Sequence, residues 1–344
     1  MGFKVELGGF QTLIQDRGRV GYGQYGVSGC GAMDEYAHRV GNILVGNSED
    51  EASLEVLMLG PTITFDEYTQ IAVTGGDLGA KINGKEIQNW RSYQINPGDV
   101  LSFRGVKSGA RAYVSIAGGI DVPLAMGSKS TYTRAKIGGF EGRALKKGDY
   151  INTFIQEKDF TINKKLSSKY IPTYSSEIVL RIVKGPQFDA FSNGEVEKFL
   201  SNKYKVTNEI DRMGCRLDGE SIKHLNGADI ISDGISYGAI QVPGHGKPII
   251  MLSDRQTSGG YTKIGNVISV DLYKLAQAKP NDVVKFELVD IYEAHRLLRE
   301  QEDKIQDIYK SMKNIRVVKA KVLNDIAAVS YTHLRAHETL RYLV

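Results

Sequence analysis

Hydrophobic residues occur in short runs along most of this chain, with polar turn-forming residues between them. Between positions 53 and 103 the runs are SLEVLML, TITF, QIAVTG, AKINGKEI, RSYQIN and DVLSF. Such runs, bounded by Gly, Pro, Asn or Asp, are typical of β-strands. Residues 3–15 add a strand, a turn and a strand, and similar texture runs from 177 to 290. The pattern therefore predicts a mainly β protein.

Apolar residues at helical spacing predict a few short helices and one at the C-terminal end. The first lies between Asp34 and Gly46-Asn47, a start and a stop signal. A second is expected around residues 195–200. The third begins at Asp290, where Glu293 completes the spacing of a capping box. Its apolar positions, which repeat every seven residues, are Ile291, Leu298, Ile305 and Met312.

The two halves of the chain echo one another. PGDVLSF at 97–103 resembles PNDVVKF at 280–286, as two copies of a related β-barrel unit would. We predict an N-terminal β-barrel domain over 1–155, a polar linker over 156–176 and a second barrel over 177–290. A helix with a basic extension follows over 291–322. The atypical tail, 323–344, resembles translated sequencing-adapter sequence, and we expect it to be foreign to the fold.

Composition narrows the class of protein. Of 344 residues, 41% are hydrophobic and 24% charged, and Lys plus Arg exceeds Asp plus Glu by 44 − 40 = 4. So small an excess argues for neither a nucleic acid nor an anionic membrane as partner. No apolar stretch approaches the roughly 20 residues that span a bilayer. The N-terminus lacks the apolar segment of a signal peptide, so the sequence predicts a cytoplasmic protein.

Four common motifs do not lead to a function. Gly21–Gly26 matches GxGxxG, but no βαβ pattern accompanies it. Gly79–Lys85 matches most of a P-loop, but its Asn83-Gly84 pair favours a hairpin turn. Gly234–Gly238 matches GxSxG, yet a strand ending at proline follows where a nucleophile elbow needs a helix. The two cysteines, Cys30 and Cys215, have no metal-binding spacing, and no metal site is expected.

Two polar, glycine-rich loops are candidate binding sites. SDRQTSGGY, at 253–261, combines a carboxylate, a guanidinium, an amide and hydroxyls with two adjacent glycines that let a ligand approach the backbone. A solvated hairpin tip is the alternative. The loop after residue 126 can bind an anion or can be a solvated loop. Its candidate donors are Ser128, Lys129, Ser130, Thr131 and Arg134.

Several longer motifs, in order along the chain, resemble one family. In the first half they are Gln15-Asp16-x-Gly18-Arg19-x-Gly21, Gly31-Ala32-Met33-Asp34, Leu54-Glu55, Ala117-Gly118-Gly119-Ile120 and Gly127-Ser128-x-Ser130-Thr131. In the second half they are Gly185-Pro186-Gln187, Asp211-Arg212-Met213-Gly214, Gly238-Ala239-Ile240-Gln241-Val242-Pro243 and Asp254-x-Gln256-Thr257-x-Gly259-Gly260-Tyr261. Together they resemble the allophanate hydrolase subunit 2 family, also called KipA-like or subdomain-A carboxyltransferase. Ser258 and Thr262 depart from the usual pattern and leave the choice of substrate open.

The resemblance implies a fold, partners and three alternative functions. The fold would be two cyclophilin-like β-barrels. The partners would be a KipI-like B subunit, together with a LamB/YcsF-type A subunit, in an ATP-dependent 5-oxoprolinase that uses ATP with Mg²⁺. The alternatives are half of a biotin-dependent carboxyltransferase acting on urea, with biotin on another chain or domain, and a non-enzymatic KipA-like antagonist of a kinase inhibitor.

The resemblance also implies site residues. The catalytic ones would be Asp211, Arg212, Gln241, Asp254 and Gln256. The substrate-binding ones would be Thr257, Gly259, Gly260, Tyr261, Asp16, Arg19 and Asp34. In this hypothesis Arg212 and Gln256 polarise lactam or phosphate oxygens, while Asp254 orients them or handles a proton. The alternative is that Asp16–Arg19 and Asp211–Arg212 are structural ion pairs that brace loops.

Overall fold

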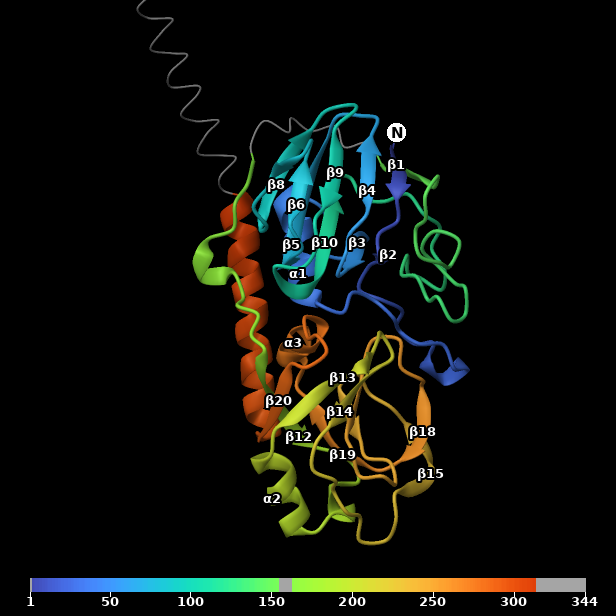
Figure 1. The fold of residues 1–344 in the computed structure, drawn as a ribbon, viewed down its shortest axis with the longest axis vertical. Helices are drawn as coiled ribbons and strands as arrows, with labels where there is room; N and C mark the ends of the chain where they lie inside the picture. Colours follow the sequence, from blue (N-terminus) through green and yellow to red (C-terminus); the bar gives the residue numbers. More distant parts are fainter. Residues whose placement is uncertain (1, 155–162, 314–344) are drawn as a thin grey trace, which may run out of the picture. The chain divides into compact units, whose positions relative to one another are not determined.

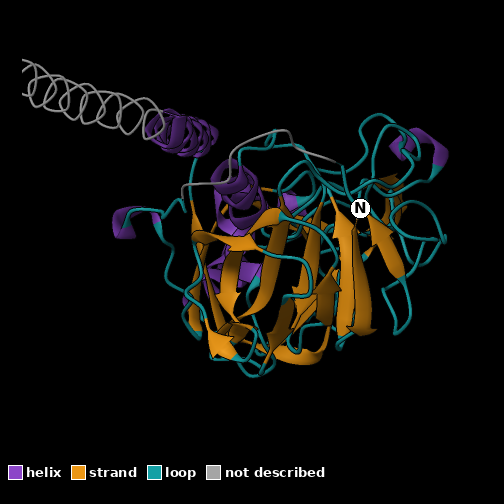
Figure 2. Cartoon of the chain, turned by 90° about the horizontal axis from the view of Figure 1, so that it is seen from above, coloured by secondary structure: helices purple, strands orange, loops and turns teal. Residues whose placement is uncertain are grey.

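A computed structural model describes residues 2–154 and 163–313 of the chain (Figure 1). The atypical tail lies outside the described residues, as do parts of the expected linker and basic extension. Residues up to 301 form one compact unit. Strands and loops make up most of that unit (Figure 2), which confirms a mainly β fold.

The first half consists of two antiparallel sheets. Within residues 2–154, one sheet has the strand order β11-β1-β4-β9-β6-β7. Its strands are β1 (Gly2–Leu7), β4 (Thr62–Phe65), β6 (Ala80–Ile82), β7 (Lys85–Glu86), β9 (Val100–Phe103) and β11 (Tyr150–Asn152). The other sheet has the order β2-β3-β10-β5-β8. Its strands are β2 (Gln11–Gln15), β3 (Ser53–Leu57), β5 (Thr69–Asp77), β8 (Arg91–Ile95) and β10 (Ser108–Ile116).

The second half contains a closed barrel, β12-β19-β16-β17-β14-β13-β20, within residues 163–313. Its strands are β12 (Glu177–Lys184), β13 (Tyr204–Ile210), β14 (Gly214–Asp218), β16 (Ala239–Gln241), β17 (Ile249–Met251), β19 (Lys263–Val267) and β20 (Val283–Leu288). A two-stranded ribbon of β15 (Asp229–Gly234) and β18 (Ser258–Tyr261) lies beside it. The expected barrel is thus confirmed for the second half. In the first half the edge strands are not joined across the two sheets, so those sheets stay open.

Helix α1 (Glu35–Val45) starts and stops where the sequence signals indicate, the C-terminal helix starts at its predicted cap, and α3 (Leu272–Ala276) is a helix that the sequence analysis did not predict. Helix α1 begins at Asp34, whose side chain accepts a hydrogen bond from the Ala37 N–H, and ends at Gly46 in a left-handed conformation. Helices α2 (Asn193–Ser201) and α3 lie in the second half. Residues 291–313 are helical, and the Asp290 carboxylate caps that helix by accepting from the Glu293 N–H.

A 3₁₀ turn and a hairpin show the local structure of the GxGxxG segment and of the P-loop-like segment. The 3₁₀ turns are Gly23–Tyr25, Ser168–Tyr170, Phe188–Ala190 and Ser269–Asp271. The first of them occupies the GxGxxG segment, so no long helix opens there. Asn83 and Gly84 both have positive φ, at 50° and 78°, between β6 and β7, which confirms the predicted hairpin.

Alternation along the barrel strands decides which side chains face outward. Ile240, Val242 and Ile250 belong to the buried core inside the barrel. The side chains of their neighbours Gln241 and Ile249 therefore point outward from the barrel, because successive side chains in a strand point to opposite faces. The candidate site lies on the outer wall of the barrel.

Candidate functional site

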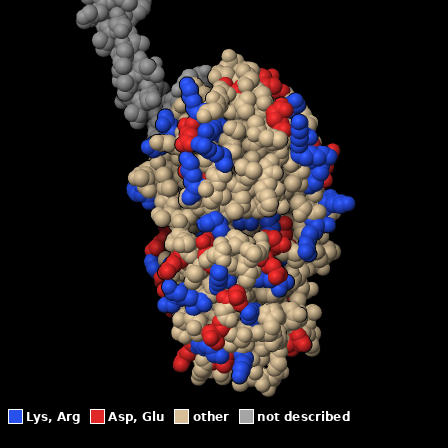
Figure 3. Space-filling model, in the orientation of Figure 1, with Lys and Arg blue, Asp and Glu red and all other residues tan. Residues whose placement is uncertain are grey.

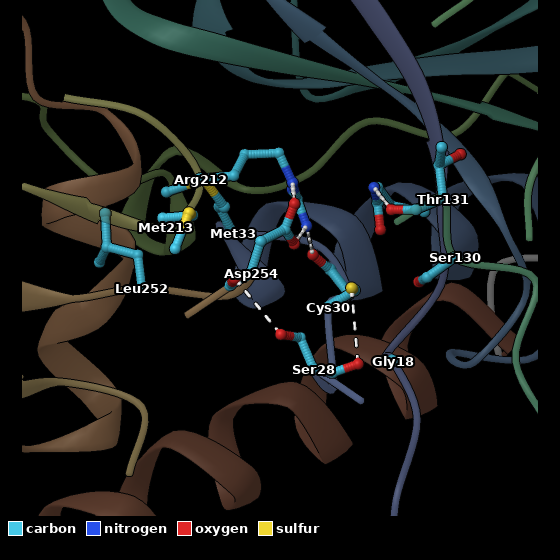
Figure 4. Close-up of polar contacts among 12 residues, drawn as sticks. Gly18, Ser28, Cys30, Met33, Ser130, Thr131, Arg212, Met213, Leu252 and Asp254 are labelled. Atoms are coloured by element: carbon cyan, nitrogen blue, oxygen red, sulfur yellow. Dashed lines mark hydrogen bonds and ion pairs between the residues drawn. The ribbon is translucent and has the colours of Figure 1, made fainter. Parts of the chain in front are cut away.

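Arg212 is buried and binds charged groups of both halves, of which Figure 4 shows Asp254. Its Nε and Nη2 donate to the two carboxylate oxygens of Asp254 at 3.0 and 2.8 Å. Nη1 donates to Oε1 of Glu55 at 2.6 Å, and Nη2 also donates to the Gly31 carbonyl at 2.8 Å. Only 6% of the residue is exposed. The guanidinium is therefore engaged by the protein itself.

Glu55 carries this network into the first half. It lies on β3, where its carboxylate also accepts hydrogen bonds from the Met33 N–H and the Tyr113 hydroxyl. Burial alone would raise the pKa of Glu55, but Arg212 and Arg111 outweigh burial and lower it. The charged form is thus stable inside the protein. Arg212 and Glu55 form a clamp between the two halves.

Asp16 is bound by the chain's own loop. Its carboxylate accepts from the hydroxyls of Ser128 and Ser130 and from the Gly18 and Lys129 N–H groups. Burial would raise the pKa of Asp16, but these hydrogen bonds lower it. Ser128, Lys129 and Ser130 of this loop therefore bind the protein's own Asp16 carboxylate, and binding of an external anion stays a prediction. Arg19 reinforces the loop by donating to the carbonyls of Ala125 and Ser130.

Asp34 lies at the boundary between the halves. Besides capping α1, its carboxylate accepts from Gln277 Nε2 at 2.8 Å and from the Tyr174 hydroxyl at 3.2 Å. Burial raises the pKa of Asp34 to about 6, although the hydrogen bonds oppose the rise. Gln277 also accepts from the Ala110 and Arg111 N–H groups and donates to the Arg111 carbonyl. Asp34 thus supports the contact between the halves.

A cavity of about 490 Å³ lies against the outer wall of the barrel. Its size is typical of small-molecule sites. It is lined by Asn208, Glu209, Ile210, Asp211, Met213, Gly214 and Arg216 from β13, β14 and the turn between them, by Gln241, Ile249, Met251, Gln256 and Tyr261, and by Arg134 from the first half. Four of the expected site residues, Asp211, Gln241, Gln256 and Tyr261, therefore meet in one cavity.

Two glutamines that line this cavity have their side-chain amides next to Gly259. A methyl group placed on Gly259 would lie 3.0 Å from Nε2 of Gln241 and 3.7 Å from Nε2 of Gln256. Gln241 is only 2% exposed, and its Nε2 has no hydrogen-bond partner among the described residues. A buried, unpaired amide donor is costly unless a ligand satisfies it. The Gln241 amide beside the cavity is therefore a buried donor that lacks an oxygen acceptor among the described residues.

The other expected residues of the GGY loop are placed around that amide. Gly259 and Gly260 lie in β18, and the Thr257 carbonyl accepts from the Ile235 N–H as the ribbon begins. Arg212 and Asp254 do not line the cavity; they lie buried, paired with one another. Asp211 lines it with one carboxylate oxygen tied to the Met213 and Gly214 N–H groups. The structure thus separates the expected set into cavity-lining residues and buried residues.

Among the buried charged residues that were not predicted as site residues, Glu55 and Lys263 lie next to predicted ones. Glu55 is in the clamp, and Lys263 lies on β19, paired across the barrel wall with Gln241. Lys263 is 2% exposed; its Nζ lies 3.2 Å from Oδ2 of Asp233 and has no hydrogen-bond partner among the described residues. A charged residue inside an apolar strand, as in SLEVLML and KIGNV, is the signal that could have identified both.

A larger surface cavity of about 600 Å³ lies on the first half beside Asp16. Its charged residues are paired with one another: Arg17 with Asp50 and Lys129 with Glu51. This cavity therefore presents compensated charges, and it contains none of the loop 253–261.

Two further statements apply to residues 2–154 and 163–313. No group of three His, Cys, Asp or Glu side chains is placed to hold a metal ion. No helix is long and apolar enough to cross a bilayer. On the face shown in Figure 3, basic and acidic side chains are intermixed rather than gathered by sign.

The chain is thus mainly β, with a closed barrel and a cavity lined by polar and apolar residues on the barrel wall. The chain belongs to the carboxyltransferase domain family, subdomain A and B, which matches residues 25–288.

Curated relatives and solved structures agree with this membership. The chain is 36% identical to the C subunit of 5-oxoprolinase from Haemophilus influenzae, over 85% of this chain and 93% of that protein. It is 32% identical to the C subunit of 5-oxoprolinase from Escherichia coli, over 87% of this chain and 95% of that protein. The urea carboxylase of Kluyveromyces lactis matches with a TM-score of 0.83 and 32% identity, over 89% of this chain but 29% of that one.

Proposed function

We propose that this chain is the C subunit of an ATP-dependent 5-oxoprolinase, which converts 5-oxoproline, ATP and water to glutamate. This proposal is supported by the match to two proteins named as C subunits of 5-oxoprolinase, over more than nine tenths of their lengths. We propose that it acts in the cytoplasm with two further subunits, one KipI-like and one of the LamB/YcsF type. In this proposal the two halves keep the cyclophilin-like character that the family resemblance implies.

The convergence of the Gln241 and Gln256 amides beside Gly259 carries the proposal. Opening a lactam places negative charge on its carbonyl oxygen. Donors fixed in advance at that position stabilise the charge without having to reorganise. Because Gln241 Nε2 has no hydrogen-bond partner among the described residues, turning this amide toward a lactam oxygen in the cavity breaks no protein hydrogen bond of that nitrogen.

Asp211 and Tyr261 complete the proposed chemistry. Asp211 has one oxygen held by two backbone N–H groups, which fixes the carboxylate, and lines the cavity with the rest of its side chain. A carboxylate held in this way can orient a water molecule or accept its proton. Tyr261 lines the same cavity and is 42% exposed, so its hydroxyl can reach a ligand there. Arg212 and Asp254 serve in this proposal to position the loops that carry these groups.

ATP supplies the free energy for opening the lactam. The described residues do not fit a Mg²⁺ site of their own: Glu209 pairs with Arg216, and Asp211 is tied to its turn. We therefore propose that ATP and Mg²⁺ are bound by the assembled complex, with the other subunits supplying the metal ligands.

The test is ATP-dependent cleavage of 5-oxoproline by the reconstituted complex of three subunits, with two buried glutamines compared. Gln241→Leu removes an unpaired donor, so the chain should keep its stability and assembly while kcat/KM falls by about 100-fold or more. Gln277→Leu removes a fully hydrogen-bonded amide, so it should lower the melting temperature first. Full activity in an assembled Gln241→Leu complex would refute the proposal.

A carboxyltransferase acting on urea is a second candidate, favoured by the structural match to urea carboxylase. The same amides would then bind the urea oxygen, and biotin would arrive on another chain or domain. The test combines the chain with its partner subunit and separately supplied biotin carboxylase components. Carboxylation of urea without any turnover of 5-oxoproline would select the carboxyltransferase function. Tight binding of a KipI-like partner with no turnover of either substrate would instead favour the non-enzymatic antagonist.

A further inference from the structure

Arg134 brings a positive charge from the first half to the cavity of the second. It lies in the loop between β10 and β11, yet it lines the same cavity as Gln241 and Gln256. The residue is exposed, and its guanidinium forms no hydrogen bond or ion pair within the part of the chain that the structure describes. An arginine free to donate at a cavity can bind an anionic group through two parallel hydrogen bonds.

The other charged groups of this cavity are already compensated. Nε of Arg216 lies 2.9 Å from Oε2 of Glu209, and these two form an ion pair. Asp211 accepts from the Met213 N–H at 2.7 Å and from the Gly214 N–H at 3.0 Å. Among the described residues that line the cavity, Arg134 is therefore the charge without a partner.

The loop that carries Arg134 is anchored at its base. Just before it, Ser128 and Ser130 hold the Asp16 carboxylate, and the Thr131 hydroxyl donates to the Ile14 carbonyl. Tyr132 and Ile137 pair across the turn with reciprocal backbone hydrogen bonds at 2.8 and 3.2 Å. Arg134 therefore projects from a turn closed at both ends. Anchoring of this kind lowers the entropy lost when a ligand binds.

We propose that Arg134 binds the carboxylate of an anionic amide substrate while Gln241 and Gln256 donate to its amide oxygen. The inference rests on the proposed function and identifies the residue that would make the enzyme prefer carboxylate-bearing amides. A lactam that bears a carboxylate would satisfy both points of contact, whereas a neutral lactam or urea would satisfy the amides alone. The substrate class is therefore carboxylate-bearing amides, and each half of the chain supplies one point of contact.

The experiment measures two constants in the reconstituted complex: KM for 5-oxoproline, and Ki for 2-pyrrolidinone, the same lactam without its carboxylate. Arg134→Gln should raise KM for 5-oxoproline by about 10- to 100-fold, as expected for one charge-assisted contact. It should leave Ki for 2-pyrrolidinone within about 2-fold, since the neutral lactam makes no contact with the guanidinium. Arg134→Lys should restore part of the affinity.

Arg104→Gln is the matched control, because Arg104 is an exposed arginine of the same half that follows β9 at a distance in sequence from the cavity loops. It should change neither constant. If Arg134→Gln leaves both constants unchanged, or raises both equally, the arginine is a solvated side chain or a structural one and the inference is wrong. If the wild-type complex does not cleave 5-oxoproline, the proposed function fails first, and the inference fails with it.

Discussion

At the scale of single residues, burial decides what a charged side chain can do. Arg212 and Asp254 saturate one another inside the protein, and Arg212 also holds Glu55. A guanidinium engaged in this way must break protein contacts before it can polarise a ligand. Asp211 and Gln256, which lie close to them in sequence, line the cavity instead. Adjacent positions in one motif thus have different roles.

Replacing Arg212 should affect folding before chemistry. Arg212→Ala leaves the Asp254 carboxylate buried without its cation and Glu55 with Arg111 alone, and we expect the free energy of unfolding to fall by about 3–5 kcal/mol. Arg212→Lys should recover only part of this, because an ammonium cannot form the bidentate contact. Denaturant titration measures the change. If the Arg212→Ala protein has wild-type stability but its complex is inactive, this expectation is wrong, and the result favours the predicted catalytic role of Arg212.

Asp34 should make stability depend on pH in an identifiable way. Burial raises its folded pKa from 3.8 to about 6, so the native state favours the protonated, neutral form. Its contribution to stability is therefore greatest below about pH 4, falls as the pH rises to about 6, and is constant above that. The displacement corresponds to about 3 kcal/mol.

Asp34→Asn tests this, because asparagine stays neutral and can still cap α1. The free energy of unfolding of the variant minus that of the wild type should increase by up to about 3 kcal/mol from pH 4 to pH 7. Denaturant titrations at a series of pH values give this difference, in which other titrating groups cancel. A difference that is flat, or that decreases with pH, would show that the pKa of Asp34 is not raised in the folded protein.

Helix caps and turns could be predicted from the sequence, whereas contacts between residues far apart in the chain could not. The cap at Asp34, the stop at Gly46 and the Asn83-Gly84 turn depend on neighbours within four residues, and all three are confirmed. Arg212 meets Glu55 across 157 positions, and Asp16 meets Ser130 across 114. No local pattern encodes such a partner, so the sequence identified the polar residues without showing which of them the protein itself satisfies.

At the scale of elements, the ribbon of β15 and β18 limits the space at the site. Gly259 leaves room where the two glutamine amides converge, and a side chain there would also meet Ile235 at 2.7 Å. Gly259→Ala should therefore displace the Gln241 amide and lower kcat/KM for 5-oxoproline by about 10-fold or more, with the complex still assembled. Steady-state kinetics of the complex measure the loss.

Gly260→Ala is the natural control for that change. The next glycine of the same strand has more room, with the Ile230 carbonyl at 3.3 Å as the nearest neighbour of an added methyl group. We expect the variant to retain kcat/KM within about 3-fold, since a methyl group there meets neither glutamine amide. Equal effects of the two substitutions would mean that backbone flexibility of β18, and not the space beside Gln241, matters.

The barrel wall also carries a buried lysine that a hydrophobic residue should replace without loss of stability. Lys263 has one exposed partner, Asp233, and an otherwise unpaired ammonium among the described residues. Lys263→Met should leave the free energy of unfolding unchanged within about 1 kcal/mol, or increase it, because the cost of burying the charge disappears. Asp233→Asn should instead destabilise the chain by leaving that charge alone. Thermal unfolding distinguishes the two, and a large loss in Lys263→Met would indicate unrecognised partners of the ammonium.

At the scale of the whole molecule, the two halves are coupled through the segment 28–34. Met33 lies in the first half by sequence, but its side chain belongs to the hydrophobic core of the barrel. The Ser28 hydroxyl and the Cys30 N–H bond to backbone carbonyls of the 253–255 segment. The Arg212–Glu55 clamp and the Gln277 contacts add to these bonds. Side chains from each half therefore contact the hydrophobic core or the polar network of the other half. Two independent domains would not share side chains in this way.

The chain should therefore unfold as one unit, and Met33→Ala should show it. Trp90, the single tryptophan, is buried in the first half, and Cys215 is buried in the barrel. In a Cys30→Ser background, tryptophan fluorescence and the reactivity of the Cys215 thiol report the two halves separately. Removing the Met33 side chain costs about 2–5 kcal/mol, and under cooperative unfolding both probes shift together because neither half is stable without the other. A shift confined to Cys215 would mean that the barrel unfolds alone, and Arg134 and Gln241 would then form one cavity only while the partner subunits hold the halves together.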